Sequence, residues 1–552
     1  MRCPVLRSDT FHMGAEDLRR VRELLSSGRG LLLDEEGIDW WDLTSLLIVP
    51  EIEAVLTFQR VALEISPAAE LWATRPGWLP SLLASLVGRP LQALAGKPLA
   101  RVARWTRHYG DVFRRFSAGE IKQIVLDKYD SDYHWRSRFA PPPKPLTEPV
   151  VLLPSAYSNV SRMAAAYAGL LRSRQFLLVA TRQSAMHFQR PPNVTVQELA
   201  AYAHTDATIQ ESTMVAEKWR KLKTELCTVR EFETLSDAGV FNRFPKWFQD
   251  GLRARNAWRE VIDRNPICGV LCGDDSNRYT RLPVLLAAQR KIPTVDFHHG
   301  ALDGGYLLKD MPCDTYLAKN EMERDYLIRL CGISSGKISI GAPLPSHATL
   351  PPENDQLPKK SVILFSEPYE NVGMRGEEVY AELLPPLCRL ARETGHDVII
   401  KLHPFESLSD RRRMVHACLS AGEREVAKLV AGPLSAQLLS RAWFGLTVES
   451  TTVMDCQLNG VPCFLCGWLS LSSYGYAQQY ARFEVGKILA SVNEIAEIPQ
   501  RLVEWGSVAV KQAKLWQTAK PEALIRQLAT RSSSDSVVLP GACEESDVQL
   551  GC

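Results

Sequence analysis

The chain has 552 residues, which at roughly 150 residues per domain corresponds to about two to four domains. Apolar residues make up 45% and charged residues 23% of the sequence, as in ordinary globular proteins, and the net charge of +2 provides no overall field for a nucleic acid. The N-terminal text lacks the apolar core of a secretory signal, and no apolar run approaches the ~20 residues of a membrane span. We therefore expect a cytoplasmic protein that binds no nucleic acid and keeps its 13 cysteines as thiols.

Residues 1–145 are expected to form an extra helical region, because they contain no long apolar strand runs. Within this region, the segment 71–110 has no acidic residue, but it carries six cationic residues together with tryptophans and leucines. Such a composition suits the anionic surface of a membrane. It also suits a helical subdomain with a solvated basic face, in which the leucines of 82–87 pack into a core. The proline-rich stretch 140–149 predicts the boundary of this region.

From residue 146 the chain alternates short apolar strands with helices. The strands are predicted at 150–155, 176–181, 267–273, 293–297, 315–319 and 337–343, with only helices between 182 and 262. Alternation of this kind predicts a doubly wound sheet of parallel strands. We expect a first Rossmann-like domain over 146–350.

Two histidines and a glycine follow the predicted strand at 293–297. Side chains of neighbouring residues on an extended backbone face opposite ways, so we expect only one of His298 and His299 to enter a cleft. Gly300 permits a sharp turn directly after them. Histidine is a suitable general base for a hydroxyl group near neutral pH. Alternatively, either ring belongs to a structural histidine in the core whose nitrogen atoms are hydrogen-bonded within the protein.

A second series of strands and helices begins after the polar, proline-rich segment 351–360. Its strands are predicted at 361–366, 397–402, 427–432, 443–448 and 462–467, followed by helical text to about 530. We expect a second Rossmann-like domain over 351–530, while 531–552 has the composition of a disordered tail. The predicted fold class is therefore α/β, with two tandem Rossmann-like domains and the extra helical N-terminal region.

The predicted strand at 397–402 runs into His403 and Pro404. Proline stops a strand, and this alone explains its position. In open α/β sheets, however, ligands bind at the carboxyl ends of the strands. His403 is therefore a candidate donor to a phosphate oxygen. Lys401 either shares this task or is a solvated lysine at the end of the strand.

Three hydroxyl residues, Ser450, Thr451 and Thr452, separate the strand that follows from a short helix. One hydroxyl is enough to cap a helix, whereas several hydroxyls, free N–H groups and the positive helix end together make an anion site. We therefore predict phosphate binding here, in the crevice that also receives His403. Asp455, one turn further on, either binds a ribose or has a structural role, through the helix dipole or in a capping box with Thr452.

Three motifs in this order resemble glycosyltransferases of the GT-B fold that build bacterial surface polysaccharides. The "HHG" turn with the following "KISIGAP", the strand end "VIIKLHP" and the run "ESTTVMDCQLNGVPCF" are similar to their "QHG", "K.HP" and "SST…E…G.P" motifs, and the resemblance covers roughly 150–500. Within that group, a histidine-proline paired with the hydroxyl run is typical of enzymes with CMP- or CDP-linked donors. These include sialic acid and Kdo transferases of capsule synthesis and CDP-glycerol glycerophosphotransferases.

The resemblance implies a role for each motif residue. His299 corresponds to the histidine before glycine, the expected catalytic base, but His298 replaces the usual glutamine, which leaves the choice between the two open. His403 corresponds to the catalytic histidine on the donor phosphate, and Asp455 stands where the family has glutamate. The substrate-binding residues that we expect are His298, Gly300, Lys401, Pro404, Ser450, Thr451, Thr452 and Asp455.

The resemblance also implies the reaction. A sugar or polyol phosphate would move from a nucleotide-activated donor in the second domain to a polysaccharide or glycolipid acceptor held by the first, without metal or cofactor. Because such acceptors are often lipid-linked, it implies a peripheral place at the inner face of the cytoplasmic membrane, with 71–110 as the contact. Two alternatives are an enzyme similar to UDP-N-acetylglucosamine 2-epimerases and a non-catalytic protein of polysaccharide assembly with the same fold.

Overall fold

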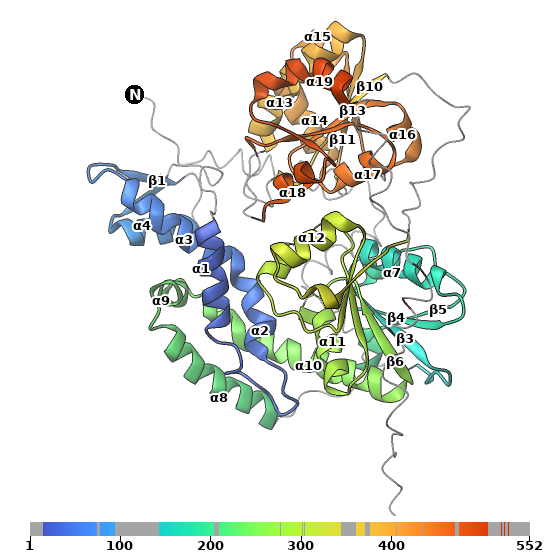
Figure 1. Ribbon diagram of the computed structural model, residues 1–552. Coiled ribbons are helices and arrows are strands. Elements are labelled where there is room, and N and C mark those ends of the chain that lie inside the picture. Colours follow the sequence, from blue (N-terminus) through green and yellow to red (C-terminus); the bar gives the residue numbers. More distant parts are fainter. Residues whose placement is uncertain are drawn as a thin grey trace, which may run out of the picture.

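Two separate sheets of parallel strands organise the computed structural model of this protein (Figure 1). The structure describes residues 15–73, 78–93, 143–203, 209–275, 278–300, 302, 304–343, 360–369, 376–403, 406–432, 434–469, 474–505, 520, 524 and 528. Figure 1 shows each sheet in its own lobe, with the N-terminal helices beside the lower one. Within the described ranges, every helix is too short or too polar to serve as a membrane span.

Both sheets have the strand order of a Rossmann fold. The seven-stranded sheet has the order β5-β4-β3-β6-β7-β8-β9 and the six-stranded sheet the order β12-β11-β10-β13-β14-β15. In each, the chain starts in the middle, adds two strands on one side and then returns to build the other side. The reversal falls between β3 and β6 and between β10 and β13, and ligands of such sheets bind at the carboxyl ends of the strands there. The prediction of two tandem Rossmann-like domains is confirmed.

The seven-stranded sheet and its helices lie between residues 150 and 340. The strands are β3 (Val150–Ser155), β4 (Gln175–Ala180), β5 (Val194–Glu198), β6 (Ile267–Cys272), β7 (Thr294–Phe297), β8 (Thr315–Ala318) and β9 (Ile338–Ile340). The helices are α7 (Ser158–Leu170), α8 (Ile209–Leu226), α9 (Arg230–Asp237), α10 (Phe244–Arg264), α11 (Arg278–Gln289) and α12 (Glu321–Arg329). Every residue of β3 is buried, as expected of a strand with both faces covered.

The six-stranded sheet follows with its own helices. The strands are β10 (Ser361–Phe365), β11 (Asp397–Lys401), β12 (Ala427–Val430), β13 (Ala442–Thr447), β14 (Cys463–Cys466) and β15 (Lys487–Leu489). The helices are α13 (Gly376–Thr394), α14 (Leu408–Cys418), α15 (Ala421–Arg424), α16 (Ala436–Ser440), α17 (Thr452–Leu458), α18 (Tyr476–Arg482), the 3-10 helix η10 (Val492–Glu497) and α19 (Ile498–Trp505). Beyond α19 the chain returns to the first sheet, where Leu524 and Leu528 are buried in the core.

Besides β1 (Leu71–Ala73) and β2 (Leu91–Ala93) of the N-terminal region, one strand of each large sheet is absent from the prediction. β5 lies in the stretch 182–262 and β15 in the stretch after 467, both of which were predicted to be helical. Each strand lies at the edge of its sheet and is only partly buried. An edge strand needs no continuous apolar run, so the pattern that identified the inner strands is missing.

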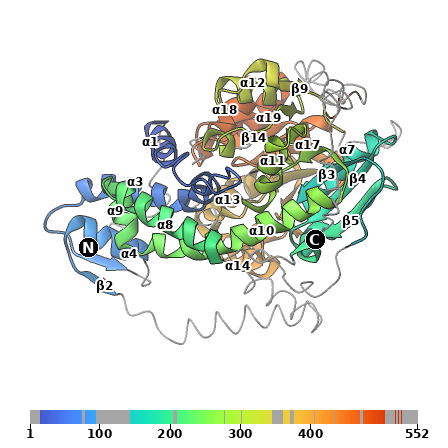
Figure 2. The ribbon, with the colours of Figure 1, turned by 90° about the horizontal axis from the view of Figure 1, so that it is seen from below.

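The N-terminal region contains α1 (Ala15–Ser26), α2 (Trp40–Ser45), α3 (Val49–Glu64) and α4 (Trp78–Val87), with a short parallel pair of β1 (Leu71–Ala73) and β2 (Leu91–Ala93). It shares one core with α8 to α10 (Figure 2). The Trp41 ring stacks on Trp219 and Phe244, with centroids 6.4 and 6.1 Å apart. Asp42 pairs with the buried Arg281 at 2.7 Å. These helices therefore pack against the first Rossmann-like domain.

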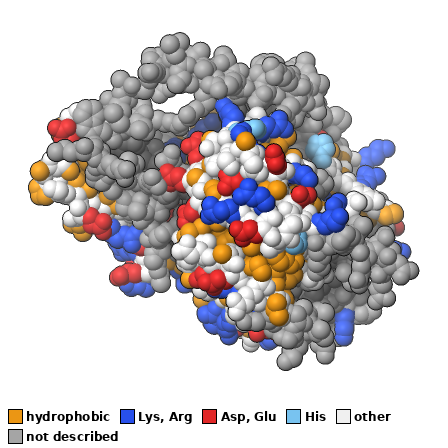
Figure 3. Space-filling view, turned by 90° about the horizontal axis from the view of Figure 1, so that it is seen from above, with side chains coloured by type: hydrophobic (Ala, Val, Ile, Leu, Met, Phe, Trp, Pro, Cys, Tyr) orange, Lys and Arg blue, Asp and Glu red, His pale blue; other side chains and the backbone are white. Residues whose placement is uncertain are grey.

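The segment 71–110 lies only partly within the described residues. Leu82 is 5% exposed and packs into the shared core, whereas Leu83 and Val87 are half-buried. Among its cationic residues, Arg89 alone falls in the described ranges, and it donates to the carbonyl groups of Ser66 and Ala69. On the face seen from above, charged side chains of both signs are interspersed (Figure 3).

Candidate functional site

The turn after β7 and the hydroxyl run after β13 meet between the two domains. A β-carbon placed on Gly300 would lie 3.5 Å from Cγ2 of Thr451. Gly300 belongs to the first domain and Thr451 to the second, so the two predicted halves of the site come together in the fold. The interface between two domains is a common place for a small-molecule site.

The two histidine rings lie side by side, with centroids 4.7 Å apart and planes inclined by 50°. The prediction that they face opposite ways is therefore wrong. β7 ends at Phe297, so the alternation of an extended strand no longer applies to His298 and His299. The His298 ring folds beneath Gly300, where an added β-carbon would lie only 2.8 Å from Cε1 of the ring. Glycine at position 300 makes room for this ring.

Burial and nearby cations determine the charge of His298. Burial lowers the pKa of His298 well below 6.5, and the charges of His299, Lys319 and Lys309 lower it further. The imidazole of His298 is therefore neutral at physiological pH. Neutral imidazole is the form that can accept a proton from a substrate hydroxyl.

Of the three hydroxyl residues after β13, Ser450 alone makes a side-chain hydrogen bond at the start of α17, within the part of the chain that the structure describes. Oγ of Ser450 accepts from the N–H of Thr452 at 3.3 Å, whereas the Thr451 side chain makes no capping hydrogen bond. Oγ1 of Thr452 is buried without a hydrogen-bond partner among the described residues. Because Thr451 and not Thr452 is the N-cap residue, the capping-box alternative for Asp455 is wrong. Asp455 lies half-buried in the first turn of α17.

Glu367, a half-buried residue that the sequence analysis missed, already places its carboxylate in this loop. Oε1 of Glu367 accepts from the N–H groups of Val448 and Glu449, both at 3.0 Å, and from Oγ1 of Thr447 at 2.8 Å. The free N–H groups that we predicted before the helix are thus partly used. Burial raises the pKa of Glu367, and the charge of Glu449 raises it further. Glu367 follows β10, at the point where the strand order reverses.

His403 is held by its backbone, at the carboxyl end of β11. Its N–H donates to Oε2 of Glu406 at 2.6 Å. The other oxygen of Glu406 accepts from Oγ of Ser366 at 2.7 Å and from Nε of Arg411 at 2.6 Å. Arg411 also donates to the carbonyl oxygen of Glu367 at 3.2 Å. The ends of β10 and β11 are thereby joined in one hydrogen-bonded network, and burial and the charge of Lys401 lower the pKa of His403.

Lys401 points away from solvent. It is 6% exposed, and its ammonium group donates to the carbonyl oxygens of Leu402 at 2.8 Å and Gly432 at 2.6 Å. The alternative of a solvated lysine is therefore wrong. Burial lowers the pKa of Lys401. Its contact with a ligand stays a prediction, and Pro404 lies outside the described residues.

Close contacts between α12 and α18 hold the two domains together beside the site. The buried amide of Gln479 donates to the carbonyl oxygen of Met322 at 2.8 Å and to Oδ2 of Asp325 at 3.0 Å. A β-carbon on Gly304 would overlap the Tyr474 ring at 2.3 Å, so the loop after the histidine turn lies directly on the second domain. The two domains are therefore in direct contact beside the histidine turn.

Metal ligands are not grouped in the part of the chain that the structure describes. No three histidine, cysteine, aspartate or glutamate side chains there are placed to hold an ion. The expected independence of metal and cofactor stays a prediction. The charges at the site come from the side chains described above.

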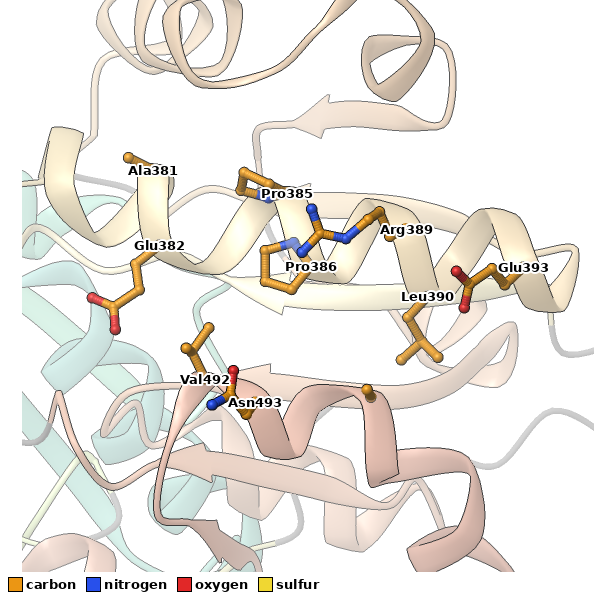
Figure 4. Close-up of a pocket in the computed structure, with 10 residues that line it drawn as sticks. Ala381, Glu382, Pro385, Pro386, Arg389, Leu390, Glu393, Val492 and Asn493 are labelled. Atoms are coloured by element: carbon orange, nitrogen blue, oxygen red, sulfur yellow. The ribbon is translucent and has the colours of Figure 1, made fainter.

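A groove of about 400 Å³ lies elsewhere, between α13 and η10 (Figure 4). Figure 4 shows Leu390 of α13 and Val492 of η10 pointing into the space between the two helices. None of the predicted site residues lines it. It is therefore separate from the crevice at Gly300 and Thr451.

No protein-family model and no curated protein matches the chain. Solved structures of similar shape include UDP-GlcNAc 2-epimerase from Neisseria meningitidis bound to UDP-GlcNAc, with 13% identity, a TM-score of 0.43, and coverage of 69% of this chain and 100% of that one. A glycosyltransferase from Rickettsia africae has 9% identity and a TM-score of 0.40, with coverage of 70% and 94%. The calicheamicin glycosyltransferase CalG4 has 12% identity and a TM-score of 0.44, with coverage of 70% and 100%. At such values the likeness carries no argument about activity.

Proposed function

We propose that this protein is a glycosyltransferase that binds a nucleotide-activated sugar between its two domains. The observation that carries the proposal is the approach of Gly300 to Thr451, which sets a histidine turn of one domain against a hydroxyl run of the other. A transferase needs a base for the acceptor hydroxyl and donors for the leaving phosphate. The two sides of this crevice supply those two kinds of group.

The phosphate of the donor is assigned to the second domain. Thr451 and Thr452 contribute hydroxyl groups that the helix cap does not use. His403, neutral at physiological pH because its pKa is lowered, still donates one ring N–H. The carboxylates of Glu367 and Glu449 stand beside the hydroxyl run and oppose an anion there. The proposal therefore depends on hydrogen-bond donors more than on net positive charge.

The acceptor hydroxyl is assigned to the first domain, with His299 as the base that removes its proton. His299 lies beside a neutral His298, on a turn that faces the donor side. Closure of the two domains around the substrates would exclude water and so limit hydrolysis of the donor. We further propose that the donor is CMP- or CDP-linked and the product a surface polysaccharide, on the motif resemblance alone.

Thermal unfolding with CMP, CDP, UDP, UMP and GDP tests the nucleotide site. At a concentration of 100 times its Kd, a ligand of the folded state adds about 2.7 kcal/mol to the free energy of unfolding. We expect at least one of the five to raise the Tm. Product analysis with the matching nucleotide sugar then separates transfer, which needs an acceptor, from epimerisation, which does not. Stabilisation by none of the nucleotides would favour the non-catalytic alternative.

We also propose a peripheral place at the inner face of the cytoplasmic membrane, supported by the composition of 71–110. We expect weak binding to anionic liposomes that falls as salt rises, with about 1 kcal/mol from each cation near the surface. Co-sedimentation of the wild type and of a triple variant with glutamate at Arg101, Arg104 and Arg107 measures it. Binding that survives the three charge reversals would speak against this contact.

A further inference from the structure

Lys319 lies directly behind the turn that carries the two histidines. It follows β8, the strand next to β7, and is only 5% exposed. Its ammonium group donates to the carbonyl oxygen of His298. The same group pairs with Oε1 of Glu323 at 3.3 Å. Lys319 therefore holds the backbone of the turn and not a histidine ring.

Glu323 binds both the backbone and the ammonium group of Lys319. Its Oε2 accepts from the backbone N–H of Lys319 at 2.6 Å, while its Oε1 faces the ammonium group. Glu323 lies in the first turn of α12, where its own N–H donates to Oδ1 of the N-cap residue Asn320 at 2.9 Å. Glu323 is 3% exposed. The position of the His298 carbonyl is thus determined by the start of α12.

Helix α12 also contacts the second domain. The Met322 carbonyl and the Asp325 carboxylate of α12 bind Gln479, and Arg482 pairs with Asp325 at 2.6 Å. α12 therefore contacts the second domain with one set of groups and holds the histidine turn with another. A change in the contact between the domains would reach the turn through this helix.

We propose that Lys319 is a positioning residue for the transfer reaction, which fixes the turn of His298 and His299 and connects it through Glu323 to the docked second domain. This inference rests on the proposed function, and it adds Lys319 to the residues proposed to take part in it. Displacement of a reacting group by about 1 Å costs about 100-fold in rate. A carbonyl held by a buried lysine keeps the turn within such a tolerance.

Lys309 offers a matched control, because it is a second buried lysine near the same ring. The ammonium group of Lys309 pairs with the Asp275 carboxylate and lies 4.5 Å from the centre of the Tyr306 ring. The ammonium group of Lys319 instead donates to the His298 carbonyl of the turn. Both lysines lower the pKa of His298 through their charge. Both variants remove a positive charge near His298. Lys319→Met also removes the hydrogen bond to the His298 carbonyl, whereas Lys309→Met removes the ion pair with Asp275.

We expect Lys319→Met to lower kcat by about 10- to 100-fold and to change the donor Kd by less than about 3-fold. Lys309→Met should lower kcat by less than about 3-fold, while titration of His298 followed by NMR should give a higher pKa in both variants. Lys319→Gln keeps an N–H donor for the carbonyl without the charge, and it should recover part of the lost kcat. This variant replaces Lys319→Met in the comparison if the methionine variant does not fold.

Equal losses of kcat in the variants at positions 319 and 309 would mean that charge alone acts, and would overturn the inference. Unchanged kcat in Lys319→Met would overturn it as well. Failure of the wild-type protein to bind any nucleotide or transfer any sugar would instead contradict the proposed function. The inference would then fall with that function, and the wild-type measurement identifies this case.

Discussion

Replacement of His299 by alanine is expected to abolish sugar transfer and to leave the donor Kd nearly unchanged. The residue belongs to the turn of the first domain, whereas the donor phosphate is assigned to the second. Loss of a general base lowers the rate by about 10²- to 10⁴-fold. Transfer rates and calorimetric titration with the donor, on the same preparation, measure the two effects separately.

His298→Ala is the companion variant, because the two rings are neighbours at 4.7 Å. We expect a smaller loss of rate and a larger loss of stability, since the half-buried His298 ring packs against Gly300 and its removal loses that packing. A reversed order of the two rate losses would identify His298 as the base. Normal transfer by both variants would place the base outside the turn.

Replacement of His403 by alanine should weaken nucleotide binding and lower kcat/KM by about 10²-fold. The physical reason is the loss of a hydrogen-bond donor to charge that develops on the leaving phosphate. The network of Glu406, Ser366 and Arg411 holds the backbone of His403, so the loop should keep its shape without the ring. Steady-state kinetics and a melting curve measure activity and folding.

His396, at the opposite end of β11 from His403, provides a control. It precedes β11, at the amino end, where its ring stacks on Trp443 with centroids 4.1 Å apart. His396→Ala should leave kcat/KM within about 2-fold of the wild type, because the amino ends of parallel strands face away from the ligand edge. Wild-type kinetics in a folded His403→Ala variant would remove this residue from the mechanism.

Apolar strand runs made the architecture predictable, most clearly where the strands are covered on both faces. β3 and β10 are wholly buried and read as continuous apolar text. β5 and β15 close the edges of their sheets, carry polar residues and escaped prediction. An apolar run reflects burial, so it is weaker in strands that lie partly in solvent; of these, β12 was predicted, whereas β5 and β15 were not.

The charged residues that follow strands were the part of the site hardest to predict from the sequence. Glu367 and Lys319 each follow an apolar strand, where a charged residue usually marks the start of a solvated loop. Their burial depends on neighbouring strands brought together by the fold, and a linear pattern does not contain that information. The orientation of His298 and His299 was predicted wrongly because β7 ends at Phe297, whereas the alternation assumes an extended backbone through both histidines.

Hydrogen–deuterium exchange with and without a saturating nucleotide sugar tests the central claim, that one ligand binds between the two domains at the histidine turn and the hydroxyl run. The sugar nucleotide is the one whose nucleotide gives the largest thermal shift. We predict slower amide exchange in 296–302 and in 446–454 together, because the ligand contacts both segments. Slower exchange in only one of these segments, or only along the groove between α13 and η10, would contradict the account.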